Sequence, residues 1–206
     1  MFKDLATTYA SNHEYMQKGS GLCGADNFPG GITNGAKWYV VKGGMQDFNY
    51  LFSNCFEITI ELSCCKYPLV DDLPIQWNAN KKSLVEYLLK VHQGIKGHVI
   101  DRTGEMVKTA TIFVENIAKP INTTENGEYW RLLTPGKYTV KAKDWKTGME
   151  SESIEVNVTV GVKIVDFKIG EDSSDPGNGA PNSCSFYCSF PIICTILQYL
   201  ACQIFT

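Results

Sequence analysis

Glu61 stands at the end of an alternating run of residues and is a candidate acid–base catalyst. In that run, Phe56, Ile58, Ile60 and Leu62 share one face of a strand, and Cys55, Glu57, Thr59 and Glu61 share the other. Open α/β sheets place their sites at the carboxyl ends of core strands, where Glu61 would lie. The alternative is a solvent-facing glutamate on an edge strand. Glu57 lies roughly 13 Å along the strand, too far to form a glycosidase pair with Glu61.

The three histidines form no recognisable metal-binding pattern. A catalytic zinc ion typically takes about three protein ligands, of which two or three are histidines. His13, His92 and His98 stand in no H-x-x-E or H-E-x-x-H spacing. We expect His92 and His98 to be surface or capping residues. The sequence also contains no G-x-S-x-G and no Walker loop, so it predicts neither a nucleophile elbow nor a phosphate-binding loop.

Composition indicates a globular protein with a core. Of 206 residues, 44% are hydrophobic and 20% are charged. The formal net charge is −3 and the sequence contains no dense basic stretch, so nucleic-acid binding is a poor hypothesis. Eight cysteines and two glycosylation sequons, at Asn122 and Asn157, favour the secretory pathway. No signal peptide is recognisable, because the chain opens directly on an amphipathic helix pattern; this indicates a chain that starts partway through its parent.

Periodicity divides the chain into residues 1–93, 94–170 and 171–206. The first region predicts a helical stripe of Phe2, Leu5, Tyr9 and Met16, a short strand over residues 37–41 and the strand over 55–62. It ends in a helix over residues 72–93, whose predicted apolar stripe is Trp77, Leu84, Tyr87, Leu88 and Val91.

The second region predicts a small antiparallel β-sandwich. Apolar and polar residues alternate over residues 95–101, 111–115, 128–132, 138–143, 154–160 and 162–169, and turn signals lie between them. The third region is a polar linker followed by an apolar tail, and it contains no charged residue after Asp175.

Three long motifs carry a resemblance to one family. The segments Phe28-Pro-Gly-Gly-Ile-Thr-Asn-Gly-Ala-Lys-Trp-Tyr39, Gly43-Gly-Met-Gln-Asp-Phe-Asn-Tyr50 and Cys55-Phe-Glu-Ile-Thr-Ile-Glu-Leu-Ser-Cys-Cys-Lys-Tyr-Pro68 closely resemble the regulatory zinc metallocarboxypeptidases of the carboxypeptidase N, E, M, D and Z group. The resemblance covers residues 1 to about 170 and is closest in appearance to members M and D. It implies the C-terminal part of an α/β catalytic domain, residues 1–93, followed by a transthyretin-like β-sandwich, residues 94–170.

The resemblance also implies roles for three side chains. Glu61 matches the general base, which takes a proton from zinc-bound water and passes it to the leaving amine. Tyr39 matches the mobile tyrosine that closes over the terminal carboxylate of the substrate. Gln46 matches the floor of the pocket for the last side chain, where its amide can accept from a Lys or Arg head group. The implied substrates are peptides with C-terminal Lys or Arg.

One departure from the family limits this reading. The H-x-x-E pair and the later His that bind zinc in the family lie upstream of anything present here, as do the substrate-binding arginines. The chain therefore resembles a fragment that keeps the base and lacks the metal, and we expect no activity from it alone. The alternative is a truncated isoform that acts as a secreted or membrane-anchored protein-binding module.

Cysteine pairing and the tail give two further expectations. The resemblance pairs Cys23 with Cys64, which closes a loop of about 40 residues and stabilises the fold by a few kcal/mol. Cys65 would then be unpaired, and Cys55 would be a buried free thiol. Small residues near residue 180, a short spacer and an apolar end over residues 184–206 resemble a GPI-anchor signal. A transmembrane or palmitoylated tail and translated intron are the alternatives.

Overall fold

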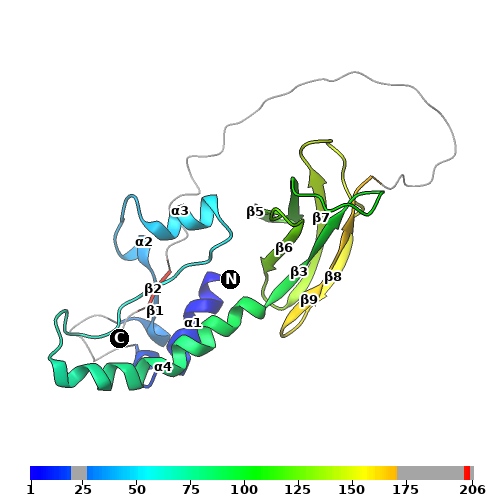
Figure 1. The fold of residues 1–206 in the computed structure, drawn as a ribbon. Coiled ribbons are helices and arrows are strands. Elements are labelled where there is room, and N and C mark those ends of the chain that lie inside the picture. Colours follow the sequence, from blue (N-terminus) through cyan, green and yellow to red (C-terminus); the bar gives the residue numbers. More distant parts are fainter. Residues whose placement is uncertain (20–26, 171–201, 205–206) are drawn as a thin grey trace.

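The computed structural model describes residues 1–19, 27–170 and 202–204. Two parts follow one another along the chain and contact each other: a part rich in helices before Gly94, and a β-sandwich after it (Figure 1).

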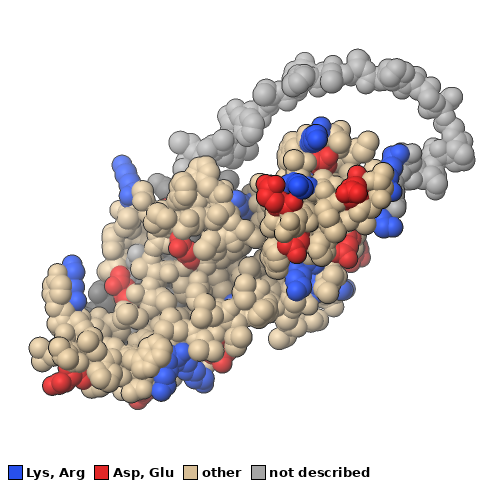
Figure 2. Space-filling view, in the orientation of Figure 1, with Lys and Arg blue, Asp and Glu red and all other residues tan. Residues whose placement is uncertain are grey.

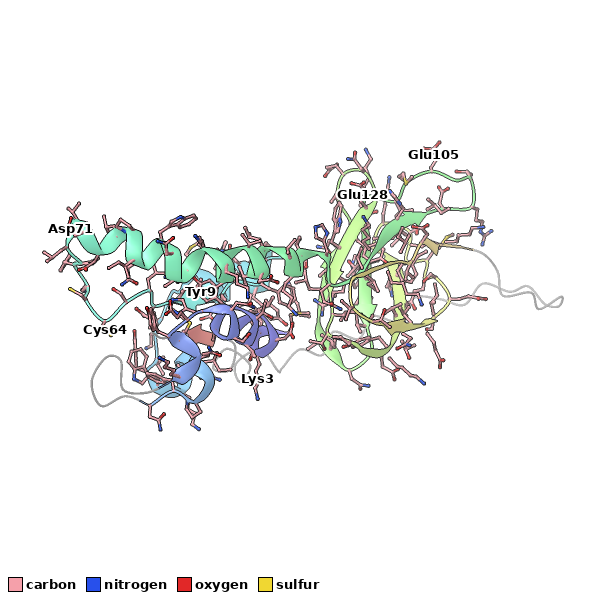
Figure 3. All side chains as sticks on the ribbon, turned by 90° about the horizontal axis from the view of Figure 1, so that it is seen from below. Lys3, Tyr9, Cys64, Asp71, Glu105 and Glu128 are labelled. Carbon is pink, nitrogen blue, oxygen red and sulfur yellow. The ribbon has the colours of Figure 1, made fainter. Side chains whose placement is uncertain are left out.

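The first part consists of four α-helices joined by loops and 3₁₀ turns. They are α1 (Phe2–Asn12), α2 (Gly35–Trp38), α3 (Met45–Phe52) and α4 (Leu73–Leu89), and the 3₁₀ turns span Met16–Lys18, Pro29–Gly31, Val70–Asp72 and Lys90–His92. Helix α1 lies along α4, with Tyr9 between them (Figure 3). The Tyr9 hydroxyl donates a hydrogen bond to Asn80 Oδ1 at 2.7 Å. Burial raises the pKa of Tyr9 to about 12, so this donor stays protonated.

The buried face of α4 matches the predicted stripe only in part: Leu84 and Tyr87 pack against the cluster that contains Tyr9, as predicted. Ala79, Asn80 and Ser83 are buried against α1, whereas Trp77 is 60% exposed and Leu88 is 66% exposed. The face of α4 that contacts α1 therefore combines Ala79 and Ser83 with Leu84 and Tyr87, whereas Trp77 and Leu88 lie off this face.

A three-stranded sheet completes the first part. Its order is β1 (Ile32–Asn34), β11 (Cys202–Ile204) and β2 (Thr59–Ile60). The strand predicted over residues 37–41 is wrong, because Lys37 lies in α2, which Asn34 caps by accepting from the Lys37 amide at 3.2 Å. The strand predicted over residues 55–62 is limited to Thr59–Ile60.

The second part is built from two four-stranded sheets around one core. One sheet contains β3 (Gly94–Ile100), β6 (Glu128–Leu132), β9 (Val162–Ile164) and β10 (Phe167–Lys168); the other has the order β5 (Ile117–Asn122), β4 (Ala110–Val114), β7 (Gly136–Asp144) and β8 (Ile154–Val158). Both sheets contribute to the core, which includes Val99, Ile112, Tyr129, Val140 and Phe167. The alternating patterns predicted all of these strands except β5, which Pro120 disguises.

One sheet is mixed rather than antiparallel. Strands β9 and β10 both run parallel to β3, and they are separated where the single predicted strand over 162–169 is interrupted. At that point the His98 amide donates to Asp166 Oδ1 at 2.8 Å, so a side-chain carboxylate replaces the backbone acceptor. A Cβ on Gly97 would lie 2.0 Å from the Val165 carbonyl oxygen, so this close approach requires glycine.

The two parts meet at an aromatic cluster beneath a buried arginine. The rings of Phe2, Tyr50 and Phe56 pack with centroid separations of 5.2 to 5.5 Å. The guanidinium of Arg131, from β6, lies 5.7 Å from the centre of the Phe56 ring. Lys119 donates to the carbonyl oxygen of residue 51 at 2.7 Å. These contacts join α1, α3 and the segment before β2 to the sandwich.

Candidate active site

Glu61 directly follows β2, and its side chain is exposed. On the opposite face of the same segment, Ile58 and Ile60 pack against the buried cluster that contains Tyr9 and Met16. The predicted alternation is only partly confirmed: Ile58 and Ile60 pack inward, but Leu62 is 51% exposed, and Glu57 and Thr59 are half-buried like the isoleucines.

Gln46 lies in the first turn of α3, and α3 brings it to β2. Its Nε2 donates a hydrogen bond to Thr59 Oγ1. Thr59 precedes Glu61 by two residues and shares its face of the strand. Gln46 and Glu61 therefore both adjoin the same strand face, although they are 15 residues apart in the sequence. We did not predict Thr59 as a contact of Gln46, although its position in the alternation is a signal that could have identified it.

Tyr39 lies just beyond α2 and is 48% exposed. Its ring packs against that of Trp38, with centroids 4.5 Å apart. Its amide donates to the Gly35 carbonyl at 2.9 Å, which ends the helix. The structure thus brings Gln46 to the strand that leads to Glu61, and it leaves Tyr39 at the open end of α2.

Glu57 is held in place by a neighbouring amide. Asn49, from α3, donates to Glu57 Oε2 at 2.6 Å. Glu57 is half-buried, whereas Glu61 is exposed. Two glutamates of the same segment therefore differ in exposure, and Asn49 of α3 holds the carboxylate of Glu57.

The histidines lie far apart in the fold and play different parts. His13 is 2% exposed, and its Nδ1 accepts from the amides of Met16 and Tyr15 at 3.1 and 3.2 Å. His92 is exposed at the end of α4, and His98 lies half-exposed on the sandwich between Glu128 and Asp166, at 3.7 and 3.6 Å. Within residues 1–19 and 27–170, no three His, Cys, Asp or Glu side chains are grouped as a metal site requires.

The cysteines partly match the expectations. Cys64 is disulfide-bonded, and its partner is not among the side chains that the structure describes. Cys23 lies outside the described residues, so its pairing with Cys64 stays a prediction. Cys65 is a free, exposed thiol, as expected. Cys55 is also free, but it is exposed and not buried as predicted. The predicted strand began at Cys55, whereas β2 forms only over Thr59–Ile60, so Cys55 is not part of the sheet.

The two sequons lie on exposed positions of the sandwich. Asn122 ends β5, and Asn157 lies in β8, an edge strand. Most of the tail that resembles an anchor signal, residues 184–201 with 205 and 206, lies outside the described residues. In the part of the chain that is described, no helix has the length and apolarity needed to cross a membrane.

Two family matches cover almost all of the two parts. Residues 1–83 match the zinc carboxypeptidases, and residues 94–169 match the carboxypeptidase regulatory-like domain. The chain is 56% identical to carboxypeptidase D of Drosophila melanogaster over 69% of its length, and 44% identical to the carboxypeptidase N catalytic chain of Mus musculus over 87%. It is 48% identical to carboxypeptidase M of Mus musculus over 68% of its length.

These relatives are much longer than the matched region. The alignments span 10% of the carboxypeptidase D, 40% of the carboxypeptidase N chain and 32% of the carboxypeptidase M. In this chain, the segment that matches the zinc carboxypeptidases precedes the segment that matches the regulatory-like domain.

Proposed function

Because the chain belongs to the zinc metallocarboxypeptidases of the carboxypeptidase D, N and M group, we propose that it is a fragment of an enzyme that removes C-terminal Lys or Arg from peptides. In this proposal residues 1–93 are the C-terminal part of the catalytic domain. Residues 94–170 are its transthyretin-like companion, and residues 171–206 are a linker and an apolar tail.

One observation carries the proposal. Gln46, the proposed specificity residue, donates a hydrogen bond to Thr59 of β2, the strand that directly precedes Glu61, and this contact supports the proposal. A carboxypeptidase needs its base near the scissile bond and its specificity pocket around the side chain of the last residue, directly after that bond. The contact between α3 and β2 supports such a placement for Glu61 and Gln46.

Each proposed residue has a chemistry suited to its role. Glu61 accepts a proton from water and returns it to the leaving amine, a step that contributes roughly 10²–10⁴-fold to a hydrolysis. Gln46 offers an amide oxygen to a cationic head group. Tyr39 is exposed and directly follows the short helix α2, a position from which its hydroxyl can approach the carboxylate of a substrate.

Zinc, which polarises water and the scissile carbonyl in this family, does not fit the residues described here. His13 is buried, His92 and His98 are at opposite ends of β3, and no suitable cluster forms within residues 1–19 and 27–170. The proposed roles of Glu61, Gln46 and Tyr39 are therefore stated for these side chains alone. The same observation favours a second candidate, a non-catalytic protein-binding module.

The test is a comparison of two glutamates in a reconstituted enzyme. The chain is co-produced with an upstream segment that carries H-x-x-E, and release of Arg from a peptide is measured. We expect Glu61→Gln to lower kcat by at least about 10²-fold, because the base is lost. The matched control, Glu57→Gln, keeps an acceptor for Asn49 and should leave kcat within about threefold. Equal losses in both variants would contradict the assignment.

The location of the protein follows from the same proposal. We propose an extracellular or cell-surface protein with N-glycans at Asn122 and Asn157, a Cys23–Cys64 disulfide and a GPI anchor attached within the tail. Both asparagines are exposed, which supports modification. Release of the expressed protein from cells by a phosphatidylinositol-specific phospholipase tests the anchor, and retention after that treatment would count against it.

A further inference from the structure

The sheet of the first part depends on a strand from the far end of the chain. Among the strands that the structure describes, β1 and β2 do not pair with each other, and β11 lies between them and pairs with both. Figure 1 shows β11, in red, beside β1 and β2. Without residues 202–204, β1 and β2 would each lose the neighbour that makes them part of this sheet.

The pairing has a defined register on both sides. Gln203 lies opposite Thr33 in the antiparallel pair with β1 and opposite Thr59 in the parallel pair with β2. A central strand uses its backbone groups on both sides, so its loss leaves backbone N–H and C=O groups unpaired on both neighbours. The gap between β1 and β2 is therefore a place that accepts one extended segment by backbone pairing.

Both acceptor strands lead directly to the candidate active site. β1 runs into α2, which ends at Tyr39, and β2 runs into Glu61. Thr59 of β2 also receives the hydrogen bond from Gln46. We therefore expect the positions of Tyr39, Gln46 and Glu61 to depend on whether the gap is filled.

We propose that residues 202–204 are a donor strand that completes this sheet within the same molecule, and that the gap between β1 and β2 is its acceptor site. The segment suits the role, because no charged residue follows Asp175 and the tail is apolar enough to be covered. Helix α1 packs against β11 and covers it. Residues 171–201 can span at most roughly 100 Å when extended, which is ample for a return from the sandwich.

The proposal concerns folding and backbone pairing, so it can be tested without an activity assay. It also competes with the anchor in the proposed function. Cleavage within the tail would remove the donor strand, so an anchored form and a self-completed form exclude one another. Failure of one proposal leaves the other open to its own test.

The test is hydrogen exchange on two variants at the same residue. Gln203→Pro removes the N–H at the centre of the donor strand and restricts its backbone, whereas Gln203→Val keeps the N–H and favours a strand. We expect the amides of Ile32–Asn34 and Thr59–Ile60 to exchange at least tenfold faster in Gln203→Pro and to be unchanged in Gln203→Val. The amides of β4 and β7, in the sandwich, serve as an internal reference and should not change.

A second arm separates loss of the strand from misfolding. A chain ending at residue 201 is mixed with a synthetic peptide of residues 197–206, and the exchange of the same amides is followed. Restored protection with this peptide, but not with one that carries Gln203→Pro, supports the proposal. Equal exchange in the intact chain and in Gln203→Pro would overturn it. If these amides lose their protection from exchange when the intact chain is diluted, the strand comes from a second molecule, and pairing within one molecule is overturned.

Discussion

Arg131 provides the sharpest prediction about stability, because it is a buried cation for which the described residues offer an aromatic ring but no carboxylate. It is 3% exposed, and its Nε and Nη1 have no hydrogen-bond partner in the part of the chain that the structure describes. Burial lowers its pKa, although the guanidinium group stays charged. Lys119 lies nearby, and burial together with the charge of Arg131 lowers the pKa of that lysine as well. The junction thus holds two cations close together.

The expected effect of Arg131→Met follows from opposing contributions. Relieving the two unpaired nitrogens removes a cost of about 1–3 kcal/mol each. Losing the contact with the face of Phe56 forfeits about 0.5–2 kcal/mol. Methionine keeps the apolar length of the side chain, so little packing is lost. We expect the free energy of unfolding to rise by about 1–4 kcal/mol, in line with other replacements of buried charges by apolar residues.

Urea denaturation followed through tryptophan fluorescence measures this change. With a typical slope of about 2 kcal/mol/M, the midpoint should rise by about 0.5–2 M at an unchanged slope. The control is Arg131→Lys, which keeps a buried charge and should not raise the midpoint. A lower midpoint for Arg131→Met would refute the reasoning, because it would show that the guanidinium has a stabilising partner.

Two further changes test the sandwich and the first helix. Gly97→Ala should lower the free energy of unfolding by more than about 2 kcal/mol, because the added Cβ would lie 2.0 Å from a carbonyl oxygen. The control is Gly136→Ala, whose Cβ would have its nearest contact at 3.4 Å. It should change the free energy of unfolding by less than about 1 kcal/mol in the same urea denaturation assay. Burial lowers the pKa of His13 from its ordinary value of 6.5, against the opposing charge of Glu14. The imidazole therefore binds a proton more readily in the unfolded chain, so the free energy of unfolding should fall as the pH decreases below about 6.5. In thermal melts from pH 7.5 to 5, the melting temperature of His13→Asn should fall less than that of the unchanged protein. An identical fall in both proteins would contradict this prediction.

Much of the sandwich could be predicted from the sequence, because its strands alternate and its turns carry Gly and Pro. Val99, Ile112 and Val140 occupy inward positions of such strands and are buried in the core. β5 could not be predicted in this way, because Pro120 weakens its pattern and its role is set by pairing with β4. The parallel pairing of β9 and β10 with β3 likewise depends on contacts between distant segments.

The first part was harder to predict, since its pattern belongs to a larger domain in the family. Phe48, Trp77 and Leu88 are apolar and exposed, and Figure 2 shows few charged side chains over the visible face of this part. An apolar stripe predicts burial, but it does not say which polypeptide covers the stripe. Glu61 and Gln46 were identified by resemblance to the family, and the contact of Gln46 with Thr59 needed the structure.

The most direct test of the account is the activity of the purified 206-residue chain by itself. The chain is incubated with zinc and a peptide ending in Arg, and bound zinc and released Arg are both measured. The account predicts neither stoichiometric zinc nor released Arg, because in the proposed function Glu61 acts on water that a metal has activated, and the described residues hold no group suited to bind that metal. Arg release that a chelator abolishes would contradict the account and would require His13, His92 or His98 to serve as zinc ligands.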